Sequence, residues 1–138
     1  MAVVVGYVPT REGRAALEHA ARECTRRNTR LVVVNSAKVE RNPARDETRK
    51  FEESLEQIRR VLDQAGISHE ERVLAHGNEP AEDLIEVAEE LDAECIVIGL
   101  RRRTPIGKLF LGSNAQRILL EAGCPVIAVK AAPVSRSV

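Results

Sequence analysis

The chain has 138 residues, with 21 basic and 21 acidic side chains and an aromatic content of 2%. That length is enough for one domain with a sizeable core, which has to be built mainly from Val, Ile, Leu and Ala. The balanced charge argues against a protein held on nucleic acid by a global basic field, and no apolar run approaches the roughly 20 residues that span a bilayer.

The apolar pattern alternates between the period of a buried strand and that of an amphipathic helix. In chain order we expect a strand over 2–7, a helix from Thr10 to about 28, a strand over 31–34, a polar loop over 37–47, a helix ending at 65, an edge strand over 67–75, a helix over 81–91 after a turn, a strand over 95–98 stopped by Gly99, a helix over 113–122, a strand over 125–129, and a loose tail over 131–138.

This alternation predicts an α/β fold, a doubly wound parallel sheet of five strands in the order 3-2-1-4-5 with helices on both faces. One domain is expected over 1–130. In such sheets, ligands bind beyond the carboxyl ends of the strands, where the strand order reverses. The segments after Tyr7 and after Ile98 are therefore expected to form the ligand crevice.

Candidate phosphate-binding residues lie between the fourth expected strand and the last helix. Gly99 and Gly112 lie at the two ends of this segment, where glycine lets the backbone approach a ligand closely. Ser113 and Gln116 form an S-x-x-Q capping box, which predicts the start of the helix and a ready anion site there. Basic side chains in the same segment favour a phosphate chain; they are Arg101, Arg102, Arg103 and Lys108.

Other interpretations of these residues stay open. The two glycines also fit ordinary turn residues, the arginine run fits a solvated loop, and Ser113 fits a residue that only caps its helix. Arg101–Arg103 would suit nucleic acid as well, but the neutral chain offers almost no aromatic surface for base stacking, so we expect no nucleic-acid partner. The sequence contains no P-loop, no G-x-G-x-x-G after the first strand and no G-x-S-x-G.

Several stretches together resemble the universal stress protein family. They are residues 96–99, Gly112-Ser113, 117–119, 124–129 and the earlier turn 77–80 with its helix. The resemblance covers nearly the whole chain, and it implies a five-stranded homodimeric domain that binds ATP or AMP, with Mg²⁺ accompanying ATP. It implies a nucleotide site formed by Tyr7, Val8, Ser36, Gly99, Arg101, Arg102, Gly112, Ser113 and Asn114.

Two positions depart from the family's nucleotide pattern. Gly99, Gly112 and Ser113 match it, but Arg102 replaces the second glycine of the pattern. A side chain at that position either clashes with phosphate or grips its oxygens. Val8 occupies the place where ATP-binding members usually carry an aspartate, and one lost hydrogen bond is worth about 0.5–1.5 kcal/mol.

The function expected from the sequence is a cytoplasmic stress-response regulator that binds an adenine nucleotide. No residue stands out as a general base, so at most very slow ATP hydrolysis is expected. The alternative is a member of the same family that binds no nucleotide and acts through its dimer surface. The apolar strand Val126–Val129 lies at an expected sheet edge, and we predict that it pairs with its copy in a homodimer. The three cysteines, Cys24, Cys95 and Cys124, are expected to be small buried apolar residues without a metal or a disulfide.

Overall fold

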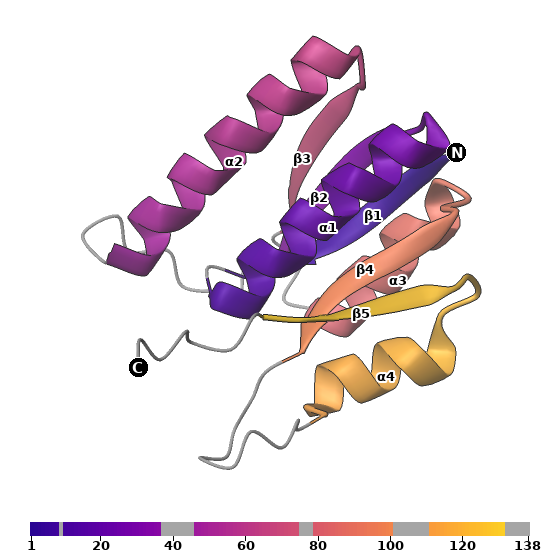
Figure 1. Cartoon of the computed structure of the whole chain (residues 1–138). Helices are drawn as coiled ribbons and strands as arrows, with labels where there is room; N and C mark the ends of the chain where they lie inside the picture. Colours follow the sequence, from indigo (N-terminus) through magenta and orange to yellow (C-terminus); the bar gives the residue numbers. More distant parts are fainter. Residues whose placement is uncertain (9, 37–45, 75–78, 101–110, 132–138) are drawn as a thin grey trace.

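The computed structural model describes residues 1–8, 10–36, 46–74, 79–100 and 111–131 (Figure 1). The elements in chain order are β1 (Ala2–Tyr7), α1 (Arg11–Arg27), β2 (Arg30–Ser36), α2 (Asp46–Ala65), β3 (His69–Leu74), α3 (Pro80–Glu90), β4 (Cys95–Leu100), α4 (Ser113–Glu121) and β5 (Val126–Lys130). All strand pairs are parallel and the order is β3-β2-β1-β4-β5. The predicted fold class and strand order are confirmed.

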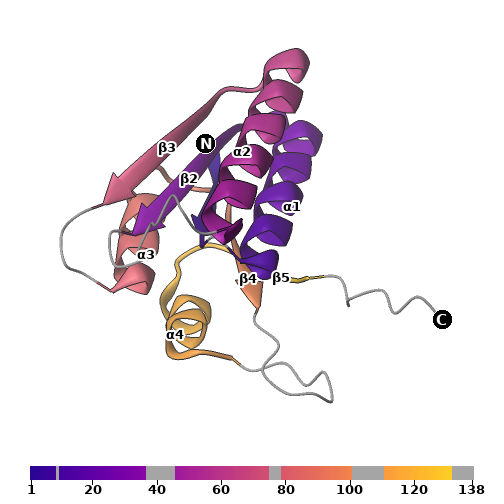
Figure 2. The ribbon, with the colours of Figure 1, turned by 90° about the vertical axis from the view of Figure 1, so that its left-hand side faces the viewer.

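Two helix layers cover opposite faces of the sheet, with α1 and α2 on one side and α3 and α4 on the other (Figure 2). Alternate residues of the continuous apolar strands supply the two cores. Val3 and Val5 pack under α1, whereas Val4 packs under α3, and each of these side chains is fully buried. Such two-sided burial is the reason why the parallel strands are apolar runs rather than alternating patterns.

The ends of α1 and α2 follow from their local sequence. The Thr10 hydroxyl accepts a hydrogen bond from the Gly13 N–H at 3.1 Å, as predicted for an N-cap. Asn28 ends α1 in the left-handed region with φ 53°, and Gly66 follows α2 with φ 72°, a conformation that glycine adopts without strain. α2 begins at Asp46, two residues earlier than expected.

The two edge strands differ in character. β3 carries charged residues that form ion pairs on both sides of the strand: Arg30 with Glu70 at 3.4 Å, Arg72 with Glu90 at 3.2 Å, and Arg59 with Glu71. Among the described strands β5 pairs with β4 alone, and its residues Val126, Ile127 and Val129 are only partly buried. β5 is therefore an apolar edge, whereas β3 is protected by charge.

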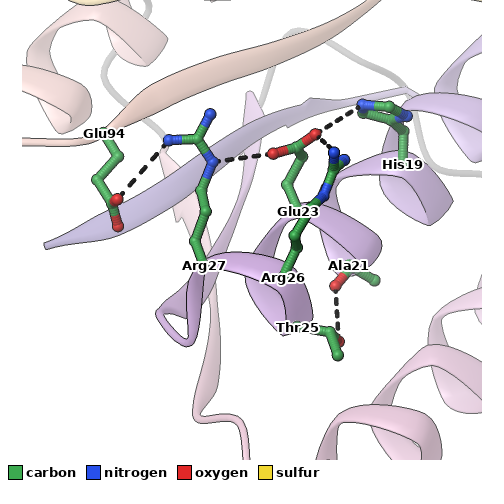
Figure 3. A network of polar contacts seen from close by, with 7 residues as sticks. All are labelled: His19, Ala21, Glu23, Thr25, Arg26, Arg27 and Glu94. Carbon is green, nitrogen blue, oxygen red and sulfur yellow. Dashed lines mark hydrogen bonds and ion pairs between the residues drawn. The ribbon is translucent and has the colours of Figure 1, made fainter.

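A buried carboxylate gathers the charged residues at the end of α1, and one of them, Arg27, reaches the residue before β4 (Figure 3). The side chain of Glu23 is 8% exposed and lies 2.5 Å from Arg26, 2.9 Å from Arg27 and 3.3 Å from His19. Arg27 also reaches Glu94, the residue before β4, at 3.7 Å. The hydrogen bond from Arg27 lowers the pKa of the Glu23 carboxyl. The spacing of apolar residues did not predict this ion-pair network.

Several predictions about single residues need correction. Gly99 does not stop β4, which continues to Leu100. The helix expected over 81–91 runs from Pro80 to Glu90, with Leu91 as its half-buried C-cap residue, and it buries Asp83, a charged residue, beside Leu84 and Val87. Cys24 and Cys95 are buried as expected, whereas Cys124 is half-buried. The expected loose tail and most of the expected 37–47 loop lie outside the described residues.

Candidate functional site

A pocket of about 300 Å³ lies at the carboxyl ends of β1 and β4, where the strand order reverses. This is the position at which open parallel sheets bind ligands. The volume is at the lower end of the range that is usual for small-molecule sites. The pocket is lined by Gly6, Tyr7, Val8, Val34, Pro80, Leu84, Ile98, Gly99, Asn114, Ala115 and Ile118.

The pocket brings together four of the predicted site residues. Tyr7 and Val8 come from the end of β1, Gly99 from β4, and Asn114 from the first turn of α4. The other predicted site residues lie elsewhere: Gly112 and Ser113 at the start of α4, and Ser36 at the end of β2, none of them in the pocket lining; Arg101 and Arg102 lie outside the described residues.

The first turn of α4 borders this pocket through Asn114 and Ala115. Gly112 is the N-cap, with extended backbone, and the first helical bond runs from the Gln116 N–H to the Gly112 carbonyl at 3.0 Å. The predicted capping box is therefore wrong: Ser113 is already the first helical residue, and no side chain caps the described start of α4. The first N–H groups of α4 have no acceptor within the helix, which favours an anion there.

Asn114 and Arg117 hold α4 against α3. The Asn114 Oδ1 accepts a hydrogen bond from the backbone N–H of Ala81 at 3.2 Å, and Arg117 bonds to Glu82 at 2.7 Å and to Glu121 at 2.7 Å. The hydrogen bonds to Glu82 and Glu121 raise the pKa of the Arg117 guanidinium. These contacts matter because Ile118 is the only residue of α4 that is fully buried.

The two glycines that match the family's nucleotide pattern, Gly99 and Gly112, differ in what surrounds them. A Cβ on Gly99 would collide with the carbonyl of Glu12, so this glycine is needed for α1 to pack on β4. A Cβ on Gly112 would meet nothing within 4 Å, and its φ of −66° is open to any residue. The fold therefore accounts for a glycine at position 99 but does not require one at position 112.

Val8 presents hydrocarbon to the pocket, and its backbone is already engaged. The Val8 carbonyl accepts a hydrogen bond from the Thr10 N–H at 2.8 Å. The same carbonyl would collide with a Cβ at position 13, so α1 starts in close contact with the end of β1. This corner of the pocket is fixed by backbone contacts.

The described lining contains no carboxylate, imidazole or thiol that could act as a general base. Over the described part of the chain there is also no cluster of His, Cys, Asp and Glu that could hold a metal ion. This arrangement suits a ligand with an apolar ring system in the pocket and an anionic group near the start of α4.

Sequence reasoning missed most of the apolar lining. The lining residues Leu84, Ile118 and Pro80 were not among the predicted site residues. One side chain can pack in the core and also line the pocket, and the spacing of apolar residues along the sequence cannot separate these two roles. The first turns of α3 and α4 were the available signal, because helix starts lie at the carboxyl end of a parallel sheet.

The fold and the pocket define a doubly wound α/β protein with a pocket where the strand order reverses. The model of the universal stress protein family matches residues 1–130, and the chain belongs to that family. A universal stress protein from Mycolicibacterium smegmatis is 41% identical over 132 residues, which are 93% of this chain and 96% of the relative.

Two solved structures extend the comparison. A universal stress protein from Archaeoglobus fulgidus is 35% identical with a TM-score of 0.68, covering 93% of this chain and 97% of that one. The structure of the universal stress protein from Archaeoglobus fulgidus in complex with dAMP is 31% identical with a TM-score of 0.64, covering 93% of this chain and 96% of that one. None of the described helices is long and apolar enough to cross a membrane.

Proposed function

We propose that this protein is a stress-response regulator that binds an adenine nucleotide in the pocket between β1 and β4. The observation that carries the proposal is the glycine at position 112, which the fold does not require and which opens the uncapped start of α4 beside the pocket. A bare backbone there lets phosphate oxygens reach the N–H groups of the helix start.

The parts of the nucleotide have separate places in this proposal. The base and sugar occupy the apolar pocket beside Val8, Ile98 and Leu84. The phosphate lies at Gly112, Ser113 and Asn114, and Ser36, Arg101 and Arg102 are proposed to complete the site. The complex of the Archaeoglobus fulgidus relative with dAMP supports an adenine nucleotide as the ligand. AMP and ATP are both candidates, with Mg²⁺ accompanying ATP.

The proposed role is sensing or regulation in the cytoplasm, with little or no hydrolysis. No described pocket residue is placed to activate a water molecule, and phosphoryl transfer depends on positioned catalytic groups. The protein would then signal its nucleotide-bound state through its surface.

The test is direct measurement of bound and added nucleotide. Protein purified without added nucleotide is denatured by heat, and the released small molecules are identified by mass spectrometry. Titration calorimetry with AMP, dAMP and ATP then gives affinities for the native protein and for Gly112→Val. The proposal expects binding by the native protein and a loss of at least about tenfold in the variant. No released nucleotide together with no titratable binding would refute it.

A second candidate function rests on the apolar edge. In this alternative the protein binds no nucleotide and acts as an interaction module through a homodimer formed by Val126–Val129. The apolar, partly buried edge strand β5 supports such a surface, and Leu120 on α4 is a further exposed apolar side chain, 80% exposed. The calorimetric result separates the two candidates, and dimerisation itself is compatible with both.

A further inference from the structure

We propose that a separate pocket, at the C-terminal ends of α3 and α4, binds a small organic ammonium ion with an apolar body. This pocket has a volume of about 220 Å³, and its lining shares no residue with that of the pocket between β1 and β4. Its walls come from the second half of α3, the start of β4 and the turn that joins α4 to β5.

The two pockets lie at opposite ends of the same pair of helices. Pro80 and Asn114, in the first turns of α3 and α4, line the pocket between β1 and β4. The separate pocket is lined by Asp92, just beyond α3, and by Ala122, the C-cap residue of α4, and both helices end where β4 and β5 begin (Figure 1). A helix has a partial negative charge at its C-terminal end. The two helix ends therefore favour a cation in this pocket.

Two carboxylates of the lining add to that negative charge. Glu89 lies in the last turn of α3, Asp92 follows the helix, and both residues are exposed. Within the described part of the chain, neither side chain forms an ion pair or a hydrogen bond. The neighbouring Glu90, in contrast, is paired with Arg72 at 3.2 Å. The pocket thus presents two carboxylates that a bound cation would neutralise.

The rest of the lining is mainly apolar. Ala88 and Ile96 are buried in the core beneath α3, and Ile85 and Cys124 are half-buried. A six-membered hydrocarbon ring fits a cavity of about 150 Å³, so this pocket can hold such a ring together with one polar group. No group of His, Cys, Asp and Glu among the described residues could hold a metal ion, and the cation that fits is therefore organic.

An ammonium group and an apolar body use the two parts of the pocket at once. The ammonium group donates hydrogen bonds to carboxylate oxygens, while the apolar body leaves water for the hydrocarbon lining. A neutral ligand of the same shape keeps only the apolar contribution. An anionic ligand of the same shape is repelled by Glu89 and Asp92.

Three ligands with the same ring test the proposal: cyclohexylamine, which is an ammonium ion at pH 7, cyclohexanol and cyclohexanecarboxylate. Each is titrated into the full chain and followed by NMR of the isoleucine δ1 methyl groups. Ile85 and Ile96 line the proposed pocket, whereas Ile98 and Ile118 line the pocket between β1 and β4, so one spectrum shows which pocket is occupied.

Cyclohexylamine should shift the methyl signals of Ile85 and Ile96 with a dissociation constant on the order of millimolar, as expected for so small a ligand. It should bind at least about threefold more tightly than cyclohexanol, which is the size of effect that partly exposed ion pairs give. Cyclohexanecarboxylate should bind most weakly. The preference for the amine should decrease as the salt concentration rises.

Variants of the two carboxylates supply the contrast. A double variant, Glu89→Gln with Asp92→Asn, removes both charges and keeps the shapes of the side chains. Asparagine also tolerates the left-handed φ of 50° at position 92. This variant should bind the amine and the alcohol equally within about twofold. Glu86→Gln changes an exposed residue of α3 outside the lining, and it should keep the native preference.

Each contrary outcome overturns the proposal. Equal native affinities for amine and alcohol would remove the charge selectivity, and a preference that persists in the double variant would assign it to other charges. Methyl shifts confined to Ile98 and Ile118 would place the amine in the other pocket. No shift with any ligand would remove the site itself. The calorimetric test with nucleotides is independent of all these results, so the proposed function stands or fails separately.

Discussion

Asn114, the second residue of α4, caps a different helix: its Oδ1 accepts the backbone N–H of Ala81 in the first turn of α3 at 3.2 Å. The N-cap residue of α3 itself, Glu79, makes no side-chain capping bond. The two helices that border the pocket therefore share one polar contact at their N-termini. This contact links the stability of α3 to the position of α4.

Replacement of Asn114 separates this structural role from ligand binding. Asn114→Ala removes the acceptor and should lower the free energy of unfolding by about 1 kcal/mol, the usual cost of a lost helix cap. Asn114→Asp keeps an acceptor and should retain most of the native stability, but its charge repels phosphate. Denaturant unfolding and calorimetry with AMP measure the two effects, and equal stability of native protein and Asn114→Ala would contradict the capping role.

Substitution by alanine should destabilise the protein more at Gly99 than at Gly112. Gly99→Ala forces a methyl group against the Glu12 carbonyl, and we expect a loss of at least about 2 kcal/mol in unfolding free energy. Gly112→Ala places its methyl group in open space and should cost less than about 1 kcal/mol, while weakening nucleotide binding. Urea unfolding of both variants checks the first contrast, and a comparable loss in Gly112→Ala would contradict it.

Helix ends followed from the sequence where the cause is local. The Thr10 cap and the Gly66 terminator act within a few residues of their own helix, so their pattern is visible in the chain. Ser113 has the same residue type as a common cap, yet the helix begins one residue earlier than that interpretation allows. The Asn114 contact with Ala81 joins positions 33 residues apart, and no local pattern can reveal it.

Acid should weaken the ion-pair network at the end of α1. The hydrogen bond from Arg27, with help from Arg26 and His19, lowers the pKa of Glu23 below its usual value of 4.5. Glu23 therefore stabilises the folded state above pH 4.5, and this contribution is lost as the pH falls through the lower folded pKa. Glu23→Gln should lower the unfolding free energy at pH 7 by about 1–2 kcal/mol.

The pH profile distinguishes this effect from a general loss of packing. The native protein and Glu23→Gln should converge in stability at low pH, because protonation of Glu23 removes the same charge. Glu18→Gln, a neutral variant on an exposed part of the same helix, should change stability by no more than about 0.5 kcal/mol. A constant difference between native protein and Glu23→Gln from pH 7 to pH 3 would contradict the prediction.

The cysteines should be unreactive in the folded protein. Burial raises the pKa of Cys24 to about 12, and it also raises the pKa of Cys95 and of Cys124. Since the thiolate is the reactive form, a disulfide reagent at pH 8 should label the native chain slowly and the denatured chain at once. Cys124 should react before the others because it is half-buried. Fast native labelling of Cys24 would contradict the burial.

Light scattering checks the expected dimer. One chain has a mass of 15.2 kDa, and pairing of two β5 edges should double the observed mass at micromolar concentration. Ala128→Lys places a charge on an exposed residue of this edge, which is how natural proteins block edge pairing. The variant should be monomeric with unchanged stability, and a monomeric native protein would contradict the prediction.

The close approach of α1 to the ends of β1 and β4 has a consequence for how fast a ligand exchanges. At Gly13 and Gly99 the contact between α1 and the strand ends is backbone against backbone, so it cannot yield by rotation of a side chain. The opposite wall is α4, held by Ile118, Asn114 and Arg117. We therefore expect uptake and release of a ligand to respond to the contacts that hold α4. Substitutions at Asn114 or Arg117 should shorten the residence time of a bound nucleotide, while the sheet side of the pocket sets only its shape.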